Sequence, residues 1–247
     1  MTETAARPPI VLVHGAWGGA WIWRRVLTPL RAAGHAVHAV TLTGVGDRAH
    51  LRRRDIGLHD HVADVVARVE AEELHDVVLV GHSYGGMVIT GAADVLMQRA
   101  SGRLRRLVYL DAVVPLPGEC WSSLHSPETV AARTAQAEAH DQSLPPPDPE
   151  AFGLAGADRD WLLRRHVPHP FGPYREPLDF DAARWAALPR SFIDCTQPAL
   201  ATIDGARRRV REQPGWRLHT MATGHFPMVS MPEALAGLLL AEAAQAA

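Results

Sequence analysis

Residues 77–89 read Val-Val-Leu-Val-Gly-His-Ser-Tyr-Gly-Gly-Met-Val-Ile, and the rest of the chain is organised around this stretch. The first four residues are apolar and mostly β-branched, which is typical of a strand buried on both faces. Residues 81–85 then fit the pattern G-x-S-x-G, and a helical pattern covers residues 86–98. A strand, a tight turn and a helix in this order predict a nucleophile elbow with Ser83 at its tip.

The glycines of this motif have a mechanical role. They allow the strand and the helix to approach closely while Ser83 adopts a strained backbone conformation. We expect Ser83 Oγ to stand exposed above the sheet, at a helix N-terminus whose dipole favours developing negative charge. The alternative is a glycine-rich turn whose serine only caps the helix. The flanking strand and helix favour the elbow.

Strands and helices alternate on both sides of this motif. Strands are expected at residues 10–13, 36–42, 77–80, 104–110, 190–195 and 216–221, and helices at 20–33, 59–74, 86–98, 199–211 and 232–244. The alternation predicts an α/β fold with a mainly parallel six-stranded sheet covered by helices on both faces.

The alternation breaks at residues 115–185. This segment includes three consecutive prolines, 145–147, and helical patterns only around residues 128–140 and 158–166. Long insertions of this kind are usually functional. We therefore expect a helical lid, or cap, inserted into a core made of residues 1–114 and 186–247.

The amino-acid composition of the chain excludes several classes of function. The chain has 247 residues, 47% hydrophobic and 21% charged, with a formal net charge of −2, which predicts one globular core and no nucleic-acid or membrane partner. All 25 basic residues are arginine, so lysine-based covalent catalysis is excluded.

The sequence also indicates the compartment. Cys120 and Cys195 do not have the spacing of metal ligands. Residues 1–9 lack a signal-peptide pattern, and no apolar run has the length of a membrane span. We expect a cytoplasmic protein. The oligomeric state stays open, a homodimer included.

A serine nucleophile needs a base and an oxyanion hole. His225 lies in the loop after the last predicted strand, which is where the base of such an enzyme is expected. The alternative for His225 is an ordinary loop residue. The backbone N–H groups of Tyr84, directly after Ser83, and of Ala16, in the loop after the first strand, are the expected oxyanion donors. The alternative for that loop is a simple turn.

Three stretches together carry a family resemblance: His-Gly-Ala-Trp-Gly-Gly-Ala-Trp-Ile-Trp at 14–23, Gly-His-Ser-Tyr-Gly-Gly at 81–86, and Thr-Gly-His at 223–225. They resemble the α/β-hydrolase superfamily, and more closely small bacterial esterases related to plant methyl-ester esterases and hydroxynitrile lyases. The resemblance covers the chain except the lid. It implies the α/β-hydrolase fold, an acyl-transfer site without cofactor or metal, and an apolar pocket bounded by the lid.

The catalytic acid departs from this pattern. Such relatives usually carry it after the penultimate strand, in a sequence like Cys-Thr-Glu-Asp, but residues 195–198 here read Cys-Thr-Gln-Pro. Asp111, at the tip of the strand next to the nucleophile strand, is the best substitute. Asp194, inside a strand, and Asp204, in a helix, are weaker candidates. If Asp111 is only a turn residue, the triad becomes a dyad.

These observations predict a serine esterase that hydrolyses carboxylic ester or lactone bonds of a moderately apolar small molecule through an acyl-enzyme. The alternative is a carbon–carbon lyase of the hydroxynitrile type, in which threonine replaces Gly15 and a lysine follows the histidine. Both marks are absent here. A non-enzymatic small-molecule receptor is a third alternative. The residues expected to bind substrate are Gly15, Trp17, Trp121, Trp161 and Phe171.

Overall fold

The computed structural model describes residues 7–100 and 102–245. Within this part of the chain, six parallel strands form one sheet in the order β2-β1-β3-β4-β7-β8. The strands are β1 (Ile10–Val13), β2 (Val37–Val40), β3 (Val77–His82), β4 (Leu104–Leu110), β7 (Arg190–Cys195) and β8 (Trp216–Met221). The predicted six-stranded sheet is therefore confirmed.

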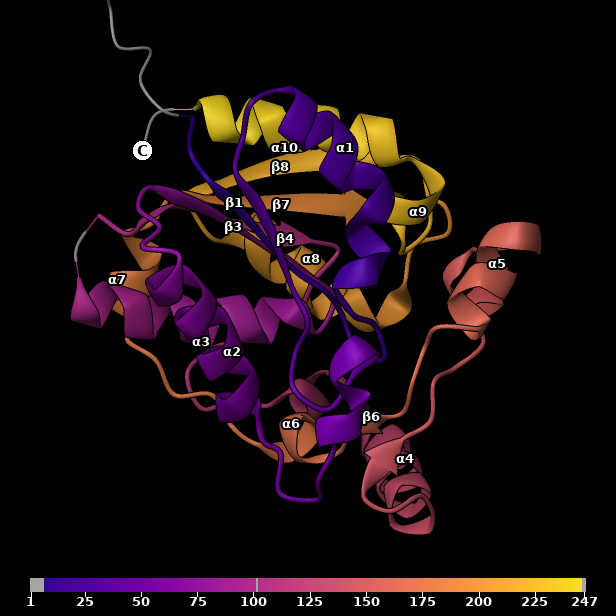
Figure 1. Ribbon diagram of the computed structural model, residues 1–247. Helices are drawn as coiled ribbons and strands as arrows, with labels where there is room; N and C mark the ends of the chain where they lie inside the picture. Colours follow the sequence, from indigo (N-terminus) through magenta and orange to yellow (C-terminus); the bar gives the residue numbers. More distant parts are fainter. Residues whose placement is uncertain (1–6, 101, 246–247) are drawn as a thin grey trace, which may run out of the picture.

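Helices cover both faces of this sheet (Figure 1). One face packs against α1 (Arg24–Ala32), α9 (Pro227–Ser230) and α10 (Pro232–Ala244), and the other against α2 (Leu58–Ala71), α3 (Gly85–Arg99) and α8 (Asp204–Glu212). The alternation of side chains along a strand divides the core accordingly. In β1, Ile10 and Leu12 join the cluster under α1 and α10, whereas Val11 and Val13 join the cluster under α2 and α3.

The segment between β4 and β7 is built of short pieces. They are the 3-10 helices η3 (Trp121–Leu124) and η4 (Pro149–Phe152), the helices α4 (Pro127–Ala139), α5 (Gly156–Leu163), α6 (Gly172–Arg175) and α7 (Ala182–Ala186), and the antiparallel strands β5 (Ser143–Leu144) and β6 (His169–Pro170). Figure 1 shows α4 and α6 at the end of the molecule away from α10, and α5 apart from them at its side. The longest piece, α4, begins where the Ser126 side chain accepts a hydrogen bond from the Thr129 N–H and Pro127 occupies the first turn.

Several elements differ from the sequence-based boundaries: β3 extends to His82, α2 ends at Ala71, and the helix predicted at 199–211 becomes the 3-10 helix η5 (Ala201–Ile203) and α8. Two further differences concern the second strand and the first helix. The strand predicted at 36–42 ends at Val40, because the Leu42 N–H donates to His14 Nε2 at 3.1 Å instead of pairing with a neighbouring strand. The helix predicted at 20–33 is divided into the 3-10 helix η1 (Ala20–Trp23) and α1.

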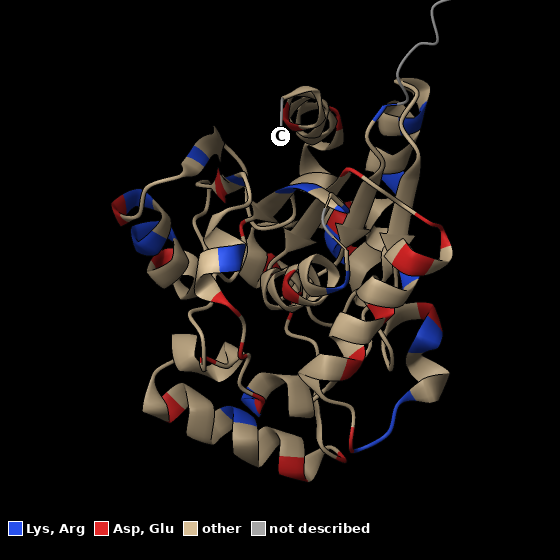
Figure 2. Cartoon of the chain, turned by 90° about the vertical axis from the view of Figure 1, so that its left-hand side faces the viewer, with Lys and Arg blue, Asp and Glu red and all other residues tan. Residues whose placement is uncertain are grey.

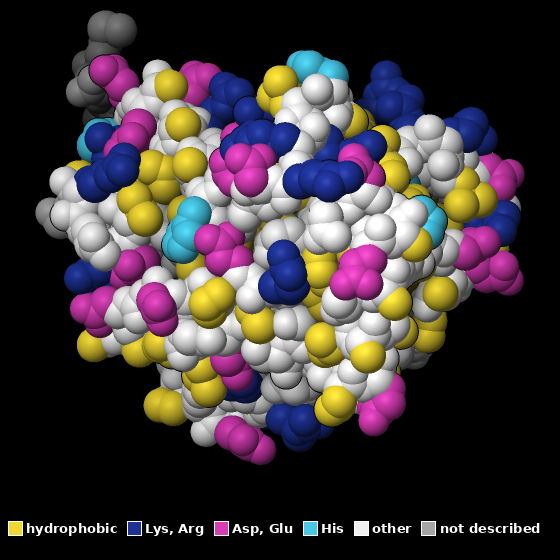
Figure 3. All heavy atoms as spheres, turned by 90° about the horizontal axis from the view of Figure 1, so that it is seen from below, with side chains coloured by type: hydrophobic (Ala, Val, Ile, Leu, Met, Phe, Trp, Pro, Cys, Tyr) yellow, Lys and Arg dark blue, Asp and Glu magenta, His cyan; other side chains and the backbone are white. Residues whose placement is uncertain are grey.

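Charged residues are spread over the exterior. Figure 2 shows acidic and basic residues close together on the outer helices, while the strands are mostly uncharged. On the face seen in Figure 3, neither sign of charge gathers into one patch. In the described part of the chain, no helix combines the length and the apolar character needed to cross a membrane.

Candidate active site

Ser83 occupies the turn between β3 and α3. Its φ angle is +55°, in the left-handed region that non-glycine residues rarely adopt. Gly81 and Gly85 make this turn possible. A Cβ on Gly81 would lie 2.6 Å from the Gly85 carbonyl oxygen, and a Cβ on Gly85 would lie 2.9 Å from the His14 carbonyl oxygen. The close approach inferred from the motif is present, and Ser83 is half-buried at the bottom of a cavity.

His225 lies in the loop between β8 and α9, with its Nε2 atom 2.9 Å from Ser83 Oγ. Two backbone contacts hold this residue. The His225 N–H donates to the Phe152 carbonyl at 3.1 Å, and His82 Nε2 lies 2.7 Å from the His225 carbonyl oxygen, to which it donates. Burial holds the pKa of His82 well below its usual value, which favours a neutral ring under the imidazole of His225.

Asp111 follows β4 and is fully buried. Its Oδ2 atom lies 2.6 Å from His225 Nδ1. The structure therefore brings Ser83, His225 and Asp111 into one hydrogen-bonded row, although they come from the ends of three different strands. Neither of the other two candidate acids contacts His225 in the described residues. Asp194 pairs with Arg207 and Arg211, and Asp204 pairs with Arg207.

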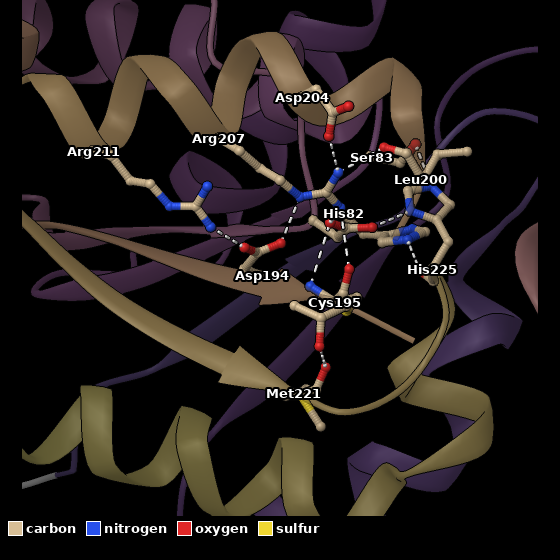
Figure 4. A network of polar contacts seen from close by, with 12 residues as sticks. His82, Ser83, Asp194, Cys195, Leu200, Asp204, Arg207, Arg211, Met221 and His225 are labelled. Atoms are coloured by element: carbon tan, nitrogen blue, oxygen red, sulfur yellow. Dashed lines mark hydrogen bonds and ion pairs between the residues drawn. The ribbon is translucent and has the colours of Figure 1, made fainter. Parts of the chain in front are cut away.

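Arg207, on α8, was not identified from the sequence. Its side chain is 5% exposed, and its guanidinium bonds three carboxylates. Nη2 lies 2.7 Å from Asp111 Oδ1. Nε lies 2.5 Å from Asp194 Oδ1 and Nη1 lies 2.8 Å from Asp204 Oδ1, as Figure 4 shows. Among 25 arginines, no local pattern marks this one. Its position follows only from the packing of α8 against the ends of β4 and β7.

The loop after β1 brings Gly15 and Ala16 beside the Ser83 turn. A Cβ on Gly15 would lie 2.9 Å from Ser83 Cβ. His14 holds this loop, since its Nδ1 atom lies 2.6 Å from the Gly15 carbonyl oxygen and its Nε2 atom accepts from Leu42. In the part of the chain that the structure describes, the backbone N–H groups of Ala16 and Tyr84 donate to no protein acceptor.

Ser83 and His225 open into a cavity lined by residues of the core and of the 115–185 segment. The lining residues are Gly15, Ala16, Trp17, His82, Ser83, Val113, Trp121, Leu124, His125, Arg133, Phe152, Leu200, Thr202, Ile203, His225 and Phe226. Three of the five predicted substrate-binding residues are among them: Gly15, Trp17 and Trp121. The sequence-based set did not include His125, Arg133 or Phe152, which follow no motif.

The other two predicted pocket residues are corrected. Trp161 packs edge-to-face against Trp21, with ring centroids 5.0 Å apart, outside this cavity. Phe171 is 1% exposed and stacks on Tyr174 with centroids 5.6 Å apart, so it lies behind the cavity wall. An apolar side chain in an insertion can lie in the core or in the wall of a pocket, and only the packing of the insertion distinguishes the two positions.

Among the described residues, no group of three or more His, Cys, Asp or Glu side chains is placed to hold a metal ion. Cys120 and Cys195 are both free thiols, and burial raises the pKa of Cys195 far above its usual range.

Comparison with known proteins identifies the family of this chain. The family model described as "Alpha/beta hydrolase family" matches residues 10–238. An extracellular α/β-hydrolase from a Paenibacillus species has the same fold, with a TM-score of 0.82 at 22% identity, covering 95% of this chain and 98% of that one. The chain belongs to the alpha/beta hydrolase family.

Two relatives narrow the class. The carbendazim hydrolyzing esterase of Nocardioides sp. (strain SG-4G) is 40% identical over 240 residues, covering 94% of this chain and 98% of that protein. Methylesterase 3 of Arabidopsis thaliana is 27% identical over 266 residues, covering 97% of each. The resemblance to bacterial and plant esterases is confirmed, and the protein is an enzyme that hydrolyses carboxylic esters.

Proposed function

We propose that this enzyme cleaves a carboxylic ester or lactone bond of a moderately apolar small molecule through an acyl-enzyme formed on Ser83. The observation that carries the proposal is the row of Ser83 Oγ, His225 Nε2 and Nδ1, and Asp111 Oδ2, with separations of 2.9 and 2.6 Å. A neutral imidazole that receives a proton at Nε2 while Nδ1–H faces a carboxylate is the arrangement that activates a serine hydroxyl.

In the first half of the reaction, Ser83 Oγ attacks the ester carbonyl carbon and its proton passes to His225 Nε2. The tetrahedral oxyanion receives hydrogen bonds from the backbone N–H groups of Ala16 and Tyr84, which are the free donors beside the nucleophile. Collapse of this intermediate breaks the bond to the alkoxy oxygen, which takes the proton from His225. In a lactone, the leaving oxygen stays attached to the acyl group.

In the second half, His225 removes a proton from water, and the resulting hydroxide attacks the acyl carbon. The second tetrahedral intermediate uses the same two N–H donors and then releases the carboxylic acid, and Ser83 recovers its proton from His225. Asp111 stabilises the imidazolium formed in both halves. Arg207 acts as a positioning residue, because its Nη2 atom fixes the Asp111 oxygen that faces away from His225.

Residues 115–185 act as a cap in this proposal. Trp121, Leu124 and Phe152 of this segment line the cavity above Ser83, which supports an apolar pocket that excludes water. The Nocardioides relative is named for the hydrolysis of carbendazim, so carbendazim is one candidate substrate of this enzyme. A cytoplasmic location remains part of the proposal, supported by the two free thiols, and cell fractionation would test it.

A fluorophosphonate probe tests the nucleophile. It should label the native enzyme at Ser83 and leave Ser83→Ala unlabelled, whereas Ser230→Ala, which changes a serine bonded to Thr223 Oγ1, should be labelled normally. Labelling that persists in Ser83→Ala contradicts the assignment. A panel of p-nitrophenyl esters, lactones, carbendazim and a cyanohydrin then separates hydrolysis from the lyase alternative, because only a lyase releases cyanide from the cyanohydrin at an enzyme-dependent rate.

A further inference from the structure

Arg133 gives the candidate pocket a charged group that the hydrolytic mechanism does not use. It lies near the middle of α4 and lines the same cavity as Ser83 and His225. Two rings hold its guanidinium in place: the central carbon lies 5.4 Å from the ring centroid of Trp121 and 5.3 Å from that of Tyr174. Stacking of this kind fixes a guanidinium while leaving its N–H donors available at the edge.

The Arg133 guanidinium has no hydrogen-bonding partner among the described residues. No carboxylate or carbonyl oxygen there accepts from it, and its Nη1 atom is buried without a partner. Arg207 and Arg209, by contrast, each bond a carboxylate and a carbonyl oxygen. Burial lowers the pKa of Arg133, although an arginine remains charged at neutral pH. A partly desolvated cation without a counter-charge is unfavourable, so an anionic partner would stabilise it.

The rest of the cavity lining offers no such partner. Among the described residues, the lining includes no aspartate or glutamate, and Arg133 is its one arginine. His125, also in the lining, has its Nδ1 atom 3.2 Å from the Tyr174 hydroxyl. Burial, and then the charge of Arg133, lower the pKa of His125 to about 4, so its ring is neutral at pH 7. An acceptor group carried by a substrate is therefore the natural ligand of Arg133.

We propose that Arg133 is a specificity-determining residue, which selects apolar esters with a hydrogen-bond acceptor, above all a free carboxylate, at the end remote from the scissile bond. The inference rests on the proposed function, since it places the ester carbonyl of the same molecule at Ser83. A carboxylate matches the forked donors of a guanidinium, and such charge-assisted bonds are about twice as strong as neutral ones. Trp17, Trp121 and Phe152 accommodate the apolar body between the two groups.

Paired substrates test this inference. Each half-ester, methyl 4-carboxybenzoate and the monomethyl esters of glutaric, adipic and pimelic acid, is compared with a methyl ester in which isopropyl replaces the carboxylate. Arg133→Met should lower kcat/KM for the best half-ester roughly 10–100-fold and change that of its neutral partner less than about threefold. Arg133→Lys should recover part of the loss. Raising the ionic strength should weaken half-ester turnover in the native enzyme but not in Arg133→Met.

Arg165→Met is the matched control. Arg165 also stacks on two rings, at 5.7 Å from Trp21 and 5.6 Å from Trp161, but lies outside the cavity. Its replacement should affect neither member of a pair. An equal loss on both members in Arg133→Met would mean that Arg133 only packs α4 and would overturn the inference. An unchanged preference for the half-ester over its neutral partner in Arg133→Met would also overturn the inference.

Binding separates this inference from the proposed function. Calorimetric titration of the half-esters into Ser83→Ala measures recognition without turnover. The half-ester should bind Ser83→Ala, bind Ser83→Ala/Arg133→Met at least about tenfold more weakly, and bind Ser83→Ala/Arg165→Met normally. Equal affinity in the three variants overturns the role of Arg133, whatever the nucleophile is. Retained hydrolysis in Ser83→Ala overturns the nucleophile but not the role of Arg133, which the kcat/KM comparison of the paired substrates still tests.

Discussion

Asp111 and His225 are 114 residues apart in the chain, yet Asp111 Oδ2 lies 2.6 Å from His225 Nδ1. Asp111 has a φ angle of +42°, in the left-handed region that non-glycine residues rarely adopt. The carboxylate is fully buried and also accepts from Arg207. The Cys195 N–H also donates to the Asp111 Oδ1 atom at 3.4 Å. Because a buried carboxylate with three partners is held in one orientation, we expect Asp111 to orient the imidazole.

The first prediction concerns this carboxylate. Asp111→Asn should lower kcat by roughly two to four orders of magnitude, because an amide favours the wrong imidazole tautomer and does not stabilise the imidazolium. Asp204→Asn, which changes a half-exposed carboxylate that contacts Arg207 but not His225, should have far less effect. Steady-state kinetics and circular dichroism of both variants check this. A larger loss in a folded Asp204→Asn would exclude Asp111 as the acid.

The second prediction concerns Arg207. Arg207→Met removes a positive charge from the Asp111–His225 pair, so the acid limb of the pH dependence of kcat/KM should move to higher pH, with a loss of roughly 10–100-fold at pH 7. Arg207→Lys keeps the positive charge but lacks the planar, forked donors of a guanidinium, so its pH profile should lie between those of the native enzyme and Arg207→Met. Arg211→Met is the control, because Arg211 also pairs with Asp194 but contacts none of the three triad residues in the described structure. A pH profile that is unchanged in Arg207→Met would reduce Arg207 to a purely structural residue.

The third prediction concerns the crowding at Gly15. A methyl group there would lie 2.9 Å from Ser83 Cβ and 3.0 Å from His82 Nδ1, so the nucleophile must shift. Gly15→Ala should reduce kcat about 100-fold while the melting temperature changes little. Gly18→Ala in the same loop, where the nearest atom is 3.5 Å away, should retain activity. If Gly15→Ala were as active as Gly18→Ala, the Ser83 turn would be less constrained than its contacts indicate.

The fourth prediction separates the tryptophans. Trp121→Ala enlarges the cavity and should shift the preference among p-nitrophenyl esters toward longer acyl chains. Trp161→Ala removes a ring that packs on Trp21 outside the cavity, so its selectivity profile should match that of the native enzyme. The ratio of kcat/KM values between the acetate and the octanoate measures this. Similar shifts of this ratio in both variants would contradict the placement of Trp121 in the cavity wall and of Trp161 outside it.

The fifth prediction is a pH dependence of stability. His14 is fully buried, and its Nε2 atom is an acceptor for the Leu42 N–H, so protonation breaks that bond. Burial lowers the pKa of His14 from 6.5 to about 4. Between these values the unfolded chain binds the proton and the folded protein does not, so stability falls as the pH falls from about 6.5 to about 4 and is unaffected above that range.

Urea unfolding at pH 7.5, 6 and 5 measures this effect. Each buried histidine that remains neutral contributes up to about 1.4 kcal/mol per pH unit. His14→Gln keeps an acceptor but does not titrate, so its stability should depend less steeply on pH in this range. The same change at the exposed His50 should leave the slope as it is in the native protein. An identical slope in His14→Gln would show that other groups carry the acid sensitivity.

Much of the fold was predictable because it depends on local patterns. Alternating apolar strands and amphipathic helices predicted the sheet, and a serine between two glycines after a buried strand predicted the turn with φ of +55° at Ser83. The position of His225 was predictable from its place after the last strand. The contact of Asp111 with His225 could be expected because residues 195–198 lack the usual carboxylate and because parallel strands end at one edge of the sheet.

What the sequence by itself determined is therefore the order of the strands along the chain, the tight turn and the types of reactive group at the strand ends. Only the tertiary structure decided which side chains of residues 115–185 face the cavity: Trp121 and Arg133 do, Trp161 and Phe171 do not. The reason is physical. Backbone turns and strand periodicity arise from local sterics, whereas the orientation of short helices in an insertion, and the meeting of Arg207 with Asp111, depend on packing between distant segments, which no local pattern encodes.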